Sequence, residues 1–114
     1  MKIKQNEMYN AVILELHGNV MGGPDAAEMN ALLHKLLDEG KKNVVIDLAN
    51  VKFINSSGLG ILISALTTMK NGGGDLKIVN VTEKIESLLM ITKLITIFEH
   101  YDSVEEAVKS FKTN

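Results

Sequence analysis

The chain has 114 residues, of which 46% are hydrophobic and 23% are charged, a balance typical of one folded domain and not of a disordered chain. Its twelve basic residues are all lysines and its formal net charge is −2, so it lacks the arginine forks and the basic excess with which proteins bind nucleic acids. Cysteine is absent, which excludes disulfides and thiolate metal sites.

We expect no targeting segment at the start of the sequence. In MKIKQNEMYNAVILELHG, charged and polar residues interrupt every apolar run, so we expect no signal peptide. The longest apolar stretch, LGILISAL, is far shorter than the roughly 20 residues that cross a bilayer. We therefore expect a cytoplasmic protein without a membrane span. Because no repeat or linker divides the sequence, residues 1–114 are expected to form a single domain.

The first third of the chain predicts a hairpin followed by a helix. Residues 1–8 and 11–16 are expected to pair as antiparallel strands across the short connection at Tyr9 and Asn10. Residues 25–39 carry apolar side chains every three or four positions, between Pro24 and Gly40, which predicts a helix that buries one stripe.

The middle of the chain predicts a buried strand and a second helix. Residues 43–48, NVVIDL, form the continuous apolar run of a central strand. If residues 57–71 are helical, one arc of that helix is apolar and the opposite arc is polar. The expected apolar arc consists of Leu59, Leu62, Ile63, Ala65, Leu66 and Met69. The expected polar arc consists of Ser57, Gly60, Ser64, Thr67, Thr68 and Asn71.

The last third continues the alternation of strands and helices. We expect a strand over residues 75–81, a helix from 82 to about 90, a short strand over 95–99, and a final helix that begins with the capping box Ser103 and Glu106. This order predicts an α/β fold, with a mixed sheet of about five strands that starts with a hairpin, and about four helices.

The stretch NSSG lies between a strand and the helix of residues 57–71. Serines at a helix N-terminus lie beside free backbone N–H groups and the positive end of the helix dipole, where a phosphate group would be stabilised. A purely structural interpretation is that Ser56 caps the helix, Asn55 forms the turn, and Gly58 and Gly60 allow close approach of a neighbouring backbone. The residues alone leave both interpretations open.

Ile61 is the apolar residue that departs from the expected pattern of this helix. Four residues after Ser57, it falls near that serine and away from the main apolar arc. This position suggests an exposed contact residue, although a neighbouring loop could also cover it.

The sequence gives little indication of a metal site, a phosphate-binding loop or a catalytic centre. His17, His34 and His100 have no metal-ligand spacing, and residues 72–74 are three glycines that lead into a strand and lack the GK[ST] of a phosphate-binding loop. No histidine lies near Ser57 in sequence and the surrounding residues are not G-x-S-x-G, so we expect no catalysis. We predict no metal and no cofactor, and binding of a nucleotide or other anion at the helix N-terminus remains a third possible function.

Four stretches together resemble the STAS family of anti-sigma factor antagonists over nearly the whole chain: GNV…PD, VVIDLANVKFINSSGLGILI, GGGDLKIVNV and SVEEAV. The resemblance implies a cytosolic bacterial module that binds an anti-sigma factor, often itself a serine kinase, and thereby releases the sigma factor. It implies phosphorylation of Ser57, with Ser56 as the alternative, and resetting by a serine phosphatase. We expect a monomer or weak dimer. The predicted partner-binding residues are Met21, Asn55, Ser56, Ser57, Gly58, Leu59 and Ile61.

Two residues depart from the family pattern. Asn55 stands where the family usually has an aspartate before the serines, and Met21 stands where an aspartate is common in the turn after the second strand. Neither side chain carries a charge that could pair with a cation of the partner or with Mg²⁺. An alternative is therefore a constitutive binder without phosphorylation, or a binding or ligand-sensing module in a larger signalling or transport assembly.

Overall fold

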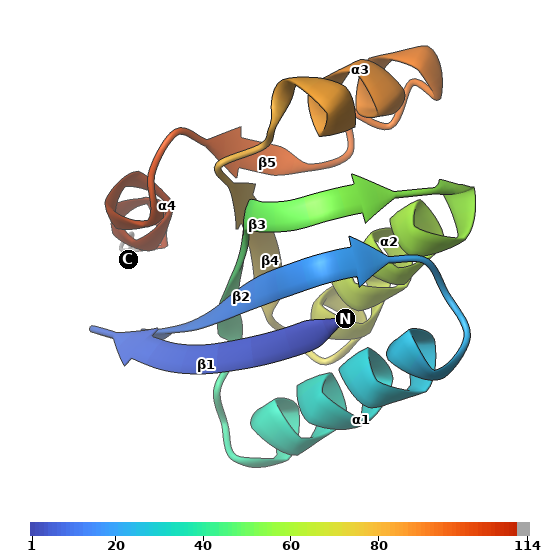
Figure 1. The fold of residues 1–114 in the computed structure, drawn as a ribbon. Helices are drawn as coiled ribbons and strands as arrows, with labels where there is room; N and C mark the ends of the chain where they lie inside the picture. Colours follow the sequence, from blue (N-terminus) through green and yellow to red (C-terminus); the bar gives the residue numbers. More distant parts are fainter. Residues whose placement is uncertain (112–114) are drawn as a thin grey trace.

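The computed structural model describes residues 1–111, which form one β-sheet flanked by helices (Figure 1). The sheet has five strands in the order β1-β2-β3-β4-β5; β1 is antiparallel to β2, and the other neighbouring pairs are parallel. The elements are β1 (Lys2–Met8), β2 (Ala11–Val20), α1 (Pro24–Asp38), β3 (Asn43–Ile54), α2 (Ser56–Asn71), β4 (Asp75–Val79), α3 (Glu83–Ile91), β5 (Glu99–Tyr101) and α4 (Val104–Ser110). The predicted α/β fold with an initial hairpin is confirmed.

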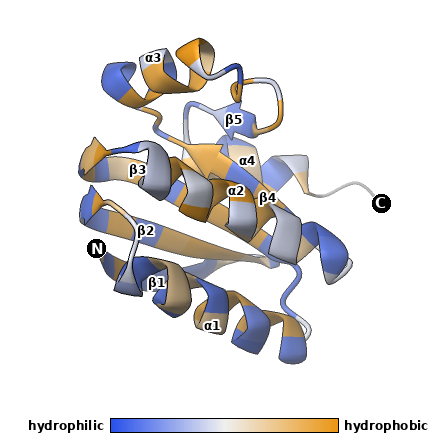
Figure 2. Cartoon of the chain, turned by 90° about the vertical axis from the view of Figure 1, so that its right-hand side faces the viewer, coloured by the Kyte–Doolittle hydropathy of each residue, from blue (hydrophilic) through white to orange (hydrophobic). Residues whose placement is uncertain are grey.

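Helices cover both faces of the sheet because the central strands are apolar on both sides. Val44 and Ile46 of β3 belong to a core cluster with α1 and α2, whereas Val45 between them packs in a second cluster with Ala107 and Val108 of α4. Successive side chains of a strand point to opposite faces, so one apolar run supplies both clusters. Figure 2 shows the resulting apolar band along β3 and β4 at the centre of the molecule.

Two strands are longer than the sequence predicted. β2 continues to Val20 and β3 to Ile54, and these two residues are partners in the last rung of the parallel ladder. The extension matters because it carries both strands to the edge where α1 and α2 begin. No helix within residues 1–111 has the length and apolar character needed to cross a membrane.

The predicted strand over residues 95–99 is wrong. Instead, residues 92–98 form turns in which the N–H groups of Leu94 and Ile95 both donate to the carbonyl of Leu89, and β5 begins only at Glu99. Phe98 is 4% exposed. The apolar character of this stretch therefore reflects a loop that packs on the core, which period-2 reasoning reads as a strand.

The predicted strand over residues 75–81 ends early, at Val79. Asn80 has a positive φ of 56° and its side-chain amide donates to Asp47 at 3.0 Å, which turns the chain toward α3. The predicted capping box of the last helix is confirmed in part: Ser103 Oγ accepts from the Glu106 N–H at 3.2 Å at the start of α4, and the reciprocal bond to the Glu106 side chain is not among the hydrogen bonds of residues 1–111.

Candidate functional site at the start of helix α2

The parallel strands β2 and β3 bring two predicted segments to one edge of the sheet. After Val20 the chain turns through residues 21–23 into α1, and after Ile54 it passes through Asn55 into α2. Because the two strands are parallel and paired to their last residues, both helix N-termini lie at this edge (Figure 1). In open α/β sheets, the carboxyl ends of the strands are where ligands and partners commonly bind.

Asn55 caps helix α2. Its side-chain oxygen accepts a hydrogen bond from the Gly58 N–H at 2.8 Å, and its backbone is extended, with φ −112°. Ser56 is the first residue of the helix, so the interpretation of Ser56 as the N-cap is wrong. Asparagine and aspartate cap helices about equally well, so the family's usual aspartate is not needed for the cap, and its replacement changes only the charge.

Both serines are free of a capping role. Ser56 and Ser57 are exposed, and neither hydroxyl makes a hydrogen bond to another group within residues 1–111. They lie in the first turn of α2, where the backbone N–H groups lack intrahelical partners and the helix dipole is positive. The first turn contains no acidic residue. This geometry favours an added negative charge.

The loop before α1 lies directly against Ser57. A Cβ atom built on Gly22 would lie 2.9 Å from the Cβ of Ser57, and Gly22 has a φ of +99°. A side chain at position 22 would therefore meet both a steric and a conformational obstacle. Met21, in the same loop, is 45% exposed. The structure thus brings the predicted residues Met21 and Ser57 to the same edge.

The two glycines of the motif have different environments. A Cβ atom on Gly58 would lie 1.8 Å from the carbonyl oxygen of Val20, whereas a Cβ atom on Gly60 would meet no atom within 4 Å. The predicted close approach of backbone is confirmed for Gly58 and is wrong for Gly60. Gly58 allows the start of α2 to rest on the end of β2.

Ile61 is buried, which contradicts its predicted exposure. It is 4% exposed, because α1 packs along the side of α2 that the helical wheel assigned to solvent. Leu59, at 2% exposure, and Gly58 are also buried. Among the predicted partner-binding residues, the surface therefore presents Met21, Ser56 and Ser57, with Asn55 half-buried.

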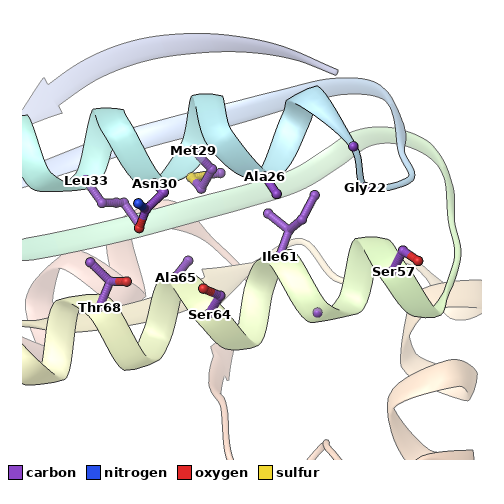
Figure 3. A pocket seen from close by; sticks show the side chains of 12 residues that line it. Gly22, Ala26, Met29, Asn30, Leu33, Ser57, Ile61, Ser64, Ala65 and Thr68 are labelled. Carbon is purple, nitrogen blue, oxygen red and sulfur yellow. The ribbon is translucent and has the colours of Figure 1, made fainter.

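A groove that the sequence did not reveal runs between α1 and α2. Its volume is about 340 Å³, and Ser57 lies at one end and Thr68 toward the other (Figure 3). Ile61 points from α2 toward α1 across it, and none of the side chains that line it carries a charge. The available signal was the mixture of small, polar and apolar residues at helical spacing on this side of α2, from Ser57 through Ile61 and Ser64 to Thr68.

No group of three or more His, Cys, Asp or Glu side chains that could hold a metal ion occurs in the described part of the chain. The shifted pKa values lie away from this edge: the hydrogen bond to Glu7 raises the pKa of Lys41, and the hydrogen bond from Lys77 is the main cause of the lowered pKa of Glu99.

The chain resembles known proteins over most of its length. The family model described as the STAS domain matches residues 2–107. The anti-sigma-B factor antagonist of Bacillus subtilis is 31% identical over 99 residues, which cover 85% of this chain and 85% of that protein.

Solved structures share the fold. The protein TM1081 of Thermotoga maritima has a TM-score of 0.85 at 24% identity, over 97% of this chain and 95% of that one. The phosphorylated form of Bacillus SpoIIAA has a TM-score of 0.72 at 14% identity, over 97% of this chain and 100% of that one. A sulfate transporter family protein of Wolinella succinogenes has a TM-score of 0.70 at 18% identity, over 89% of this chain and 84% of that one. At these identities the likeness concerns the fold alone.

The family model spans most of the chain, and the Bacillus subtilis relative exceeds 30% identity over most of both sequences. The chain therefore belongs to the STAS domain family, in the group of the anti-sigma factor antagonists.

Proposed function

We propose that this protein binds an anti-sigma factor through the edge formed by the start of α2 and the loop before α1, and thereby releases a sigma factor in the bacterial cytoplasm. The observation that carries the proposal is the exposed Ser57 in the first turn of α2, whose cap is supplied by Asn55. The relationship to the anti-sigma-B factor antagonist supports the class of partner.

In this proposal, phosphorylation of Ser57 switches binding off. The partner is a serine kinase: the Ser57 hydroxyl oxygen attacks the γ-phosphorus of ATP, its proton passes to a base of the kinase, and ADP leaves. A serine phosphatase resets the switch with water and releases inorganic phosphate. The added phosphate carries a charge of about −1.5 to −2 at neutral pH. The helix dipole favours it, so the fold should persist while the contact surface changes.

Ser57 is a better candidate for this switch than Ser56. Both are exposed and neither caps the helix, so exposure and capping do not separate them. Ser57 lines the α1–α2 groove and lies against Gly22, whereas Ser56 does neither. A phosphate on Ser57 would therefore alter the surface of both helices, and the resemblance to the family points to the same serine.

The residues at positions 21 and 55 are uncharged, which is compatible with this switch and differs from the family pattern. The family pattern has an aspartate at each of these positions, whereas Asn55 and Met21 carry no charge. Binding of unphosphorylated protein at this edge would therefore rely on apolar and hydrogen-bonding contacts. Phosphorylation then changes an uncharged contact surface into an anionic one, which must be desolvated against the partner.

The experiment is phosphorylation of the purified protein by the serine-kinase anti-sigma factor of the same organism, with ATP, followed by peptide mass mapping. Wild type and Ser56→Ala should each gain one phosphate at Ser57, and Ser57→Ala should gain none. Phosphate on Ser56, or on Ser57→Ala, would contradict the assignment. Hydrolytic activity of the pure protein that disappears in Ser57→Ala would contradict a role without catalysis.

A second candidate is a ligand-sensing or binding module without phosphorylation, within a larger assembly. The groove of about 340 Å³ beside Ser57 favours it, and the fold also occurs in a sulfate transporter family protein. Thermal unfolding in the presence of nucleotides tests this candidate, because a ligand at ~100 times its Kd adds about 2.7 kcal/mol of stability. An unchanged melting temperature at millimolar nucleotide would argue against nucleotide sensing.

A further inference from the structure

A second groove lies between the end of β3 and helix α3. Its volume is about 330 Å³. Phe53 lines one side and is 49% exposed, and Leu88 of α3 lines the groove and is half-buried. An aromatic side chain left half in water at the end of a sheet strand is a typical anchor of a protein interface.

The apolar surface continues along α3. Lys84, Leu88 and Ile91 are spaced by four and three residues, so they share one side of the helix. Ile91 is 78% exposed. Figure 2 shows the apolar colour of the end of α3 and of the loop that follows it. Phe53, Leu88 and Ile91 thus extend the groove into a larger apolar surface.

The two charged side chains that line this groove are both lysines, although the exposed Glu83 and Glu86 also lie in the first turn of α3. Lys52 and Lys84 line it and are exposed, and no aspartate or glutamate lines it. Within residues 1–111 neither lysine forms an ion pair, whereas Lys41, Lys70 and Lys77 each do. Charged groups at the rim of an interface select partners of opposite charge.

The β3–α3 groove adjoins the edge described above. Ile54 lines the groove, and the next residue, Asn55, caps α2. A protein bound over Ser57 could therefore reach Phe53 without leaving the same edge of the sheet, because only residues 54–56 separate the two positions in the chain.

We propose that the β3–α3 groove is a second docking surface for the same partner, and that it receives an acidic segment of that protein in which an apolar side chain is flanked by aspartate or glutamate. The apolar side chain would pack against Phe53 and Leu88, and the carboxylates would pair with Lys52 and Lys84. This inference rests on the proposed function, and it replaces Ile61, which is buried, as the source of apolar contact.

The test is calorimetric titration of the purified anti-sigma factor of the same organism into wild type and variants. Phe53→Ala should bind about 30-fold more weakly, as expected for a central anchor. The double variant Lys52→Glu/Lys84→Glu should bind at least about 10-fold more weakly and should lose most of the salt dependence of the wild type. Unfolding in urea should confirm that both variants remain folded.

Matched controls lie at the other end of the sheet and on its far edge strand. Tyr9 is an aromatic residue with 89% exposure, and Lys2 and Lys4 are exposed lysines of β1. Tyr9→Ala and Lys2→Glu/Lys4→Glu should bind like wild type. An equal loss in these controls would overturn the proposal, because it would show that the effect is not specific to the groove.

Three further outcomes would overturn the groove proposal, and they differ in what they imply for the proposed function. If Phe53→Ala and the lysine double variant bind like wild type while a phosphate on Ser57 abolishes binding, the groove proposal is overturned and the proposed function stands. If wild type does not bind the anti-sigma factor, both are overturned. If sedimentation shows a wild-type dimer that Phe53→Ala converts to monomer, with unchanged affinity for the anti-sigma factor, the groove is a contact between two copies and the proposal is wrong.

Discussion

Lys77 and Ser57 are the centres of two polar regions of this molecule, and they differ in how their side chains are hydrogen-bonded. Lys77, in β4, is 4% exposed; its Nζ donates to Ser110 Oγ at 2.6 Å, lies 3.1 Å from Glu99 Oε1, and lies 4.6 Å from the ring centre of Phe111. Ser57 is exposed and makes no hydrogen bond through its hydroxyl within residues 1–111. The lysine side chain makes contacts that join α4 and β5 to β4, whereas the serine hydroxyl is available to another molecule.

At these two centres, the residues that stabilise the fold differ from the residues that are open to another molecule. Around Lys77, a buried charge needs its partners, so its neighbours are fixed by stability. Around Ser57, the structural role falls to Asn55 and Gly58, and the serines themselves are free to change. Substitution of Lys77 should therefore lower the stability of the fold, whereas substitution of the serines should change binding and leave stability nearly unchanged.

The largest expected loss of stability comes from Gly58→Ala. Its Cβ atom would lie 1.8 Å from the Val20 carbonyl oxygen, and backbone cannot yield as a flexible side chain can, so we expect a loss of about 3 kcal/mol or more in the free energy of unfolding. Urea denaturation measures it. Gly60→Ala is the control: with open space at that position, it should stabilise the helix by about 0.5–1 kcal/mol. Equal stabilities of the two variants would contradict the packing described for Gly58.

The next largest loss of stability is expected at Lys77. Lys77→Ala removes the charge and the packing against two aromatic rings, and we expect a loss of about 2–3 kcal/mol. Lys77→Met, which retains most of the side-chain volume, should lose less. The control Lys70→Ala removes an exposed lysine paired with Asp75 and should change stability by no more than about 0.5 kcal/mol. A Lys77→Ala protein with wild-type stability would remove the distinction between the two centres.

A smaller effect is expected at the cap. Asn55→Ala should cost about 1 kcal/mol, because the Gly58 N–H loses its acceptor. Asn55→Asp keeps the acceptor, and its charge is favoured at the helix N-terminus, so at neutral pH it should equal or exceed wild-type stability by about 0.3–1 kcal/mol. Thermal unfolding of both variants checks this. Equal losses in both would show that the hydrogen bond to Gly58 is not what stabilises the start of α2.

The smallest effect concerns pH. The pKa of Glu99 is lowered from 4.5, first by the hydrogen bond from Lys77 and then by that from Tyr101. A carboxyl group whose pKa is lower in the folded state stabilises the fold above its unfolded-state pKa, and this contribution is lost as the pH falls through the folded-state pKa. The stability difference between wild type and Glu99→Gln should therefore shrink below about pH 4.5. A difference that does not vary from pH 6 to pH 3 would contradict the lowered pKa.

The sequence predicted the elements that depend on local patterns. Alternation and helical spacing indicated the order of strands and helices, and the stretch NSSG placed Ser56 and Ser57 at the start of a helix. Sequence patterns failed where a third element decides the environment. Ile61 is covered by α1, and residues 92–98 form turns from which Phe98 packs on the core.

The role of each residue in the motif also depended on three-dimensional contacts. Asn55 and Ser56 are both good capping residues, and only the backbone geometry assigns the cap to Asn55. Phe53 belongs to the motif's own strand, yet its exposure follows from the way β3 extends to the sheet edge. The grooves beside α1 and α3 could not be predicted, because each is lined by segments far apart in the sequence.

A charge on Ser57 should change partner binding and leave the fold unchanged. The most direct measurement is the Kd of the anti-sigma factor for phosphorylated and unphosphorylated protein, with the free energy of unfolding of both forms as the reference for folding. We predict a loss of affinity of about 30-fold or more, equivalent to about 2 kcal/mol, and we expect the phosphorylated form to be no more than about 0.5 kcal/mol less stable than the unphosphorylated form. Equal affinities of the two forms, or a phosphorylated form that unfolds, would show that Ser57 is not such a switch.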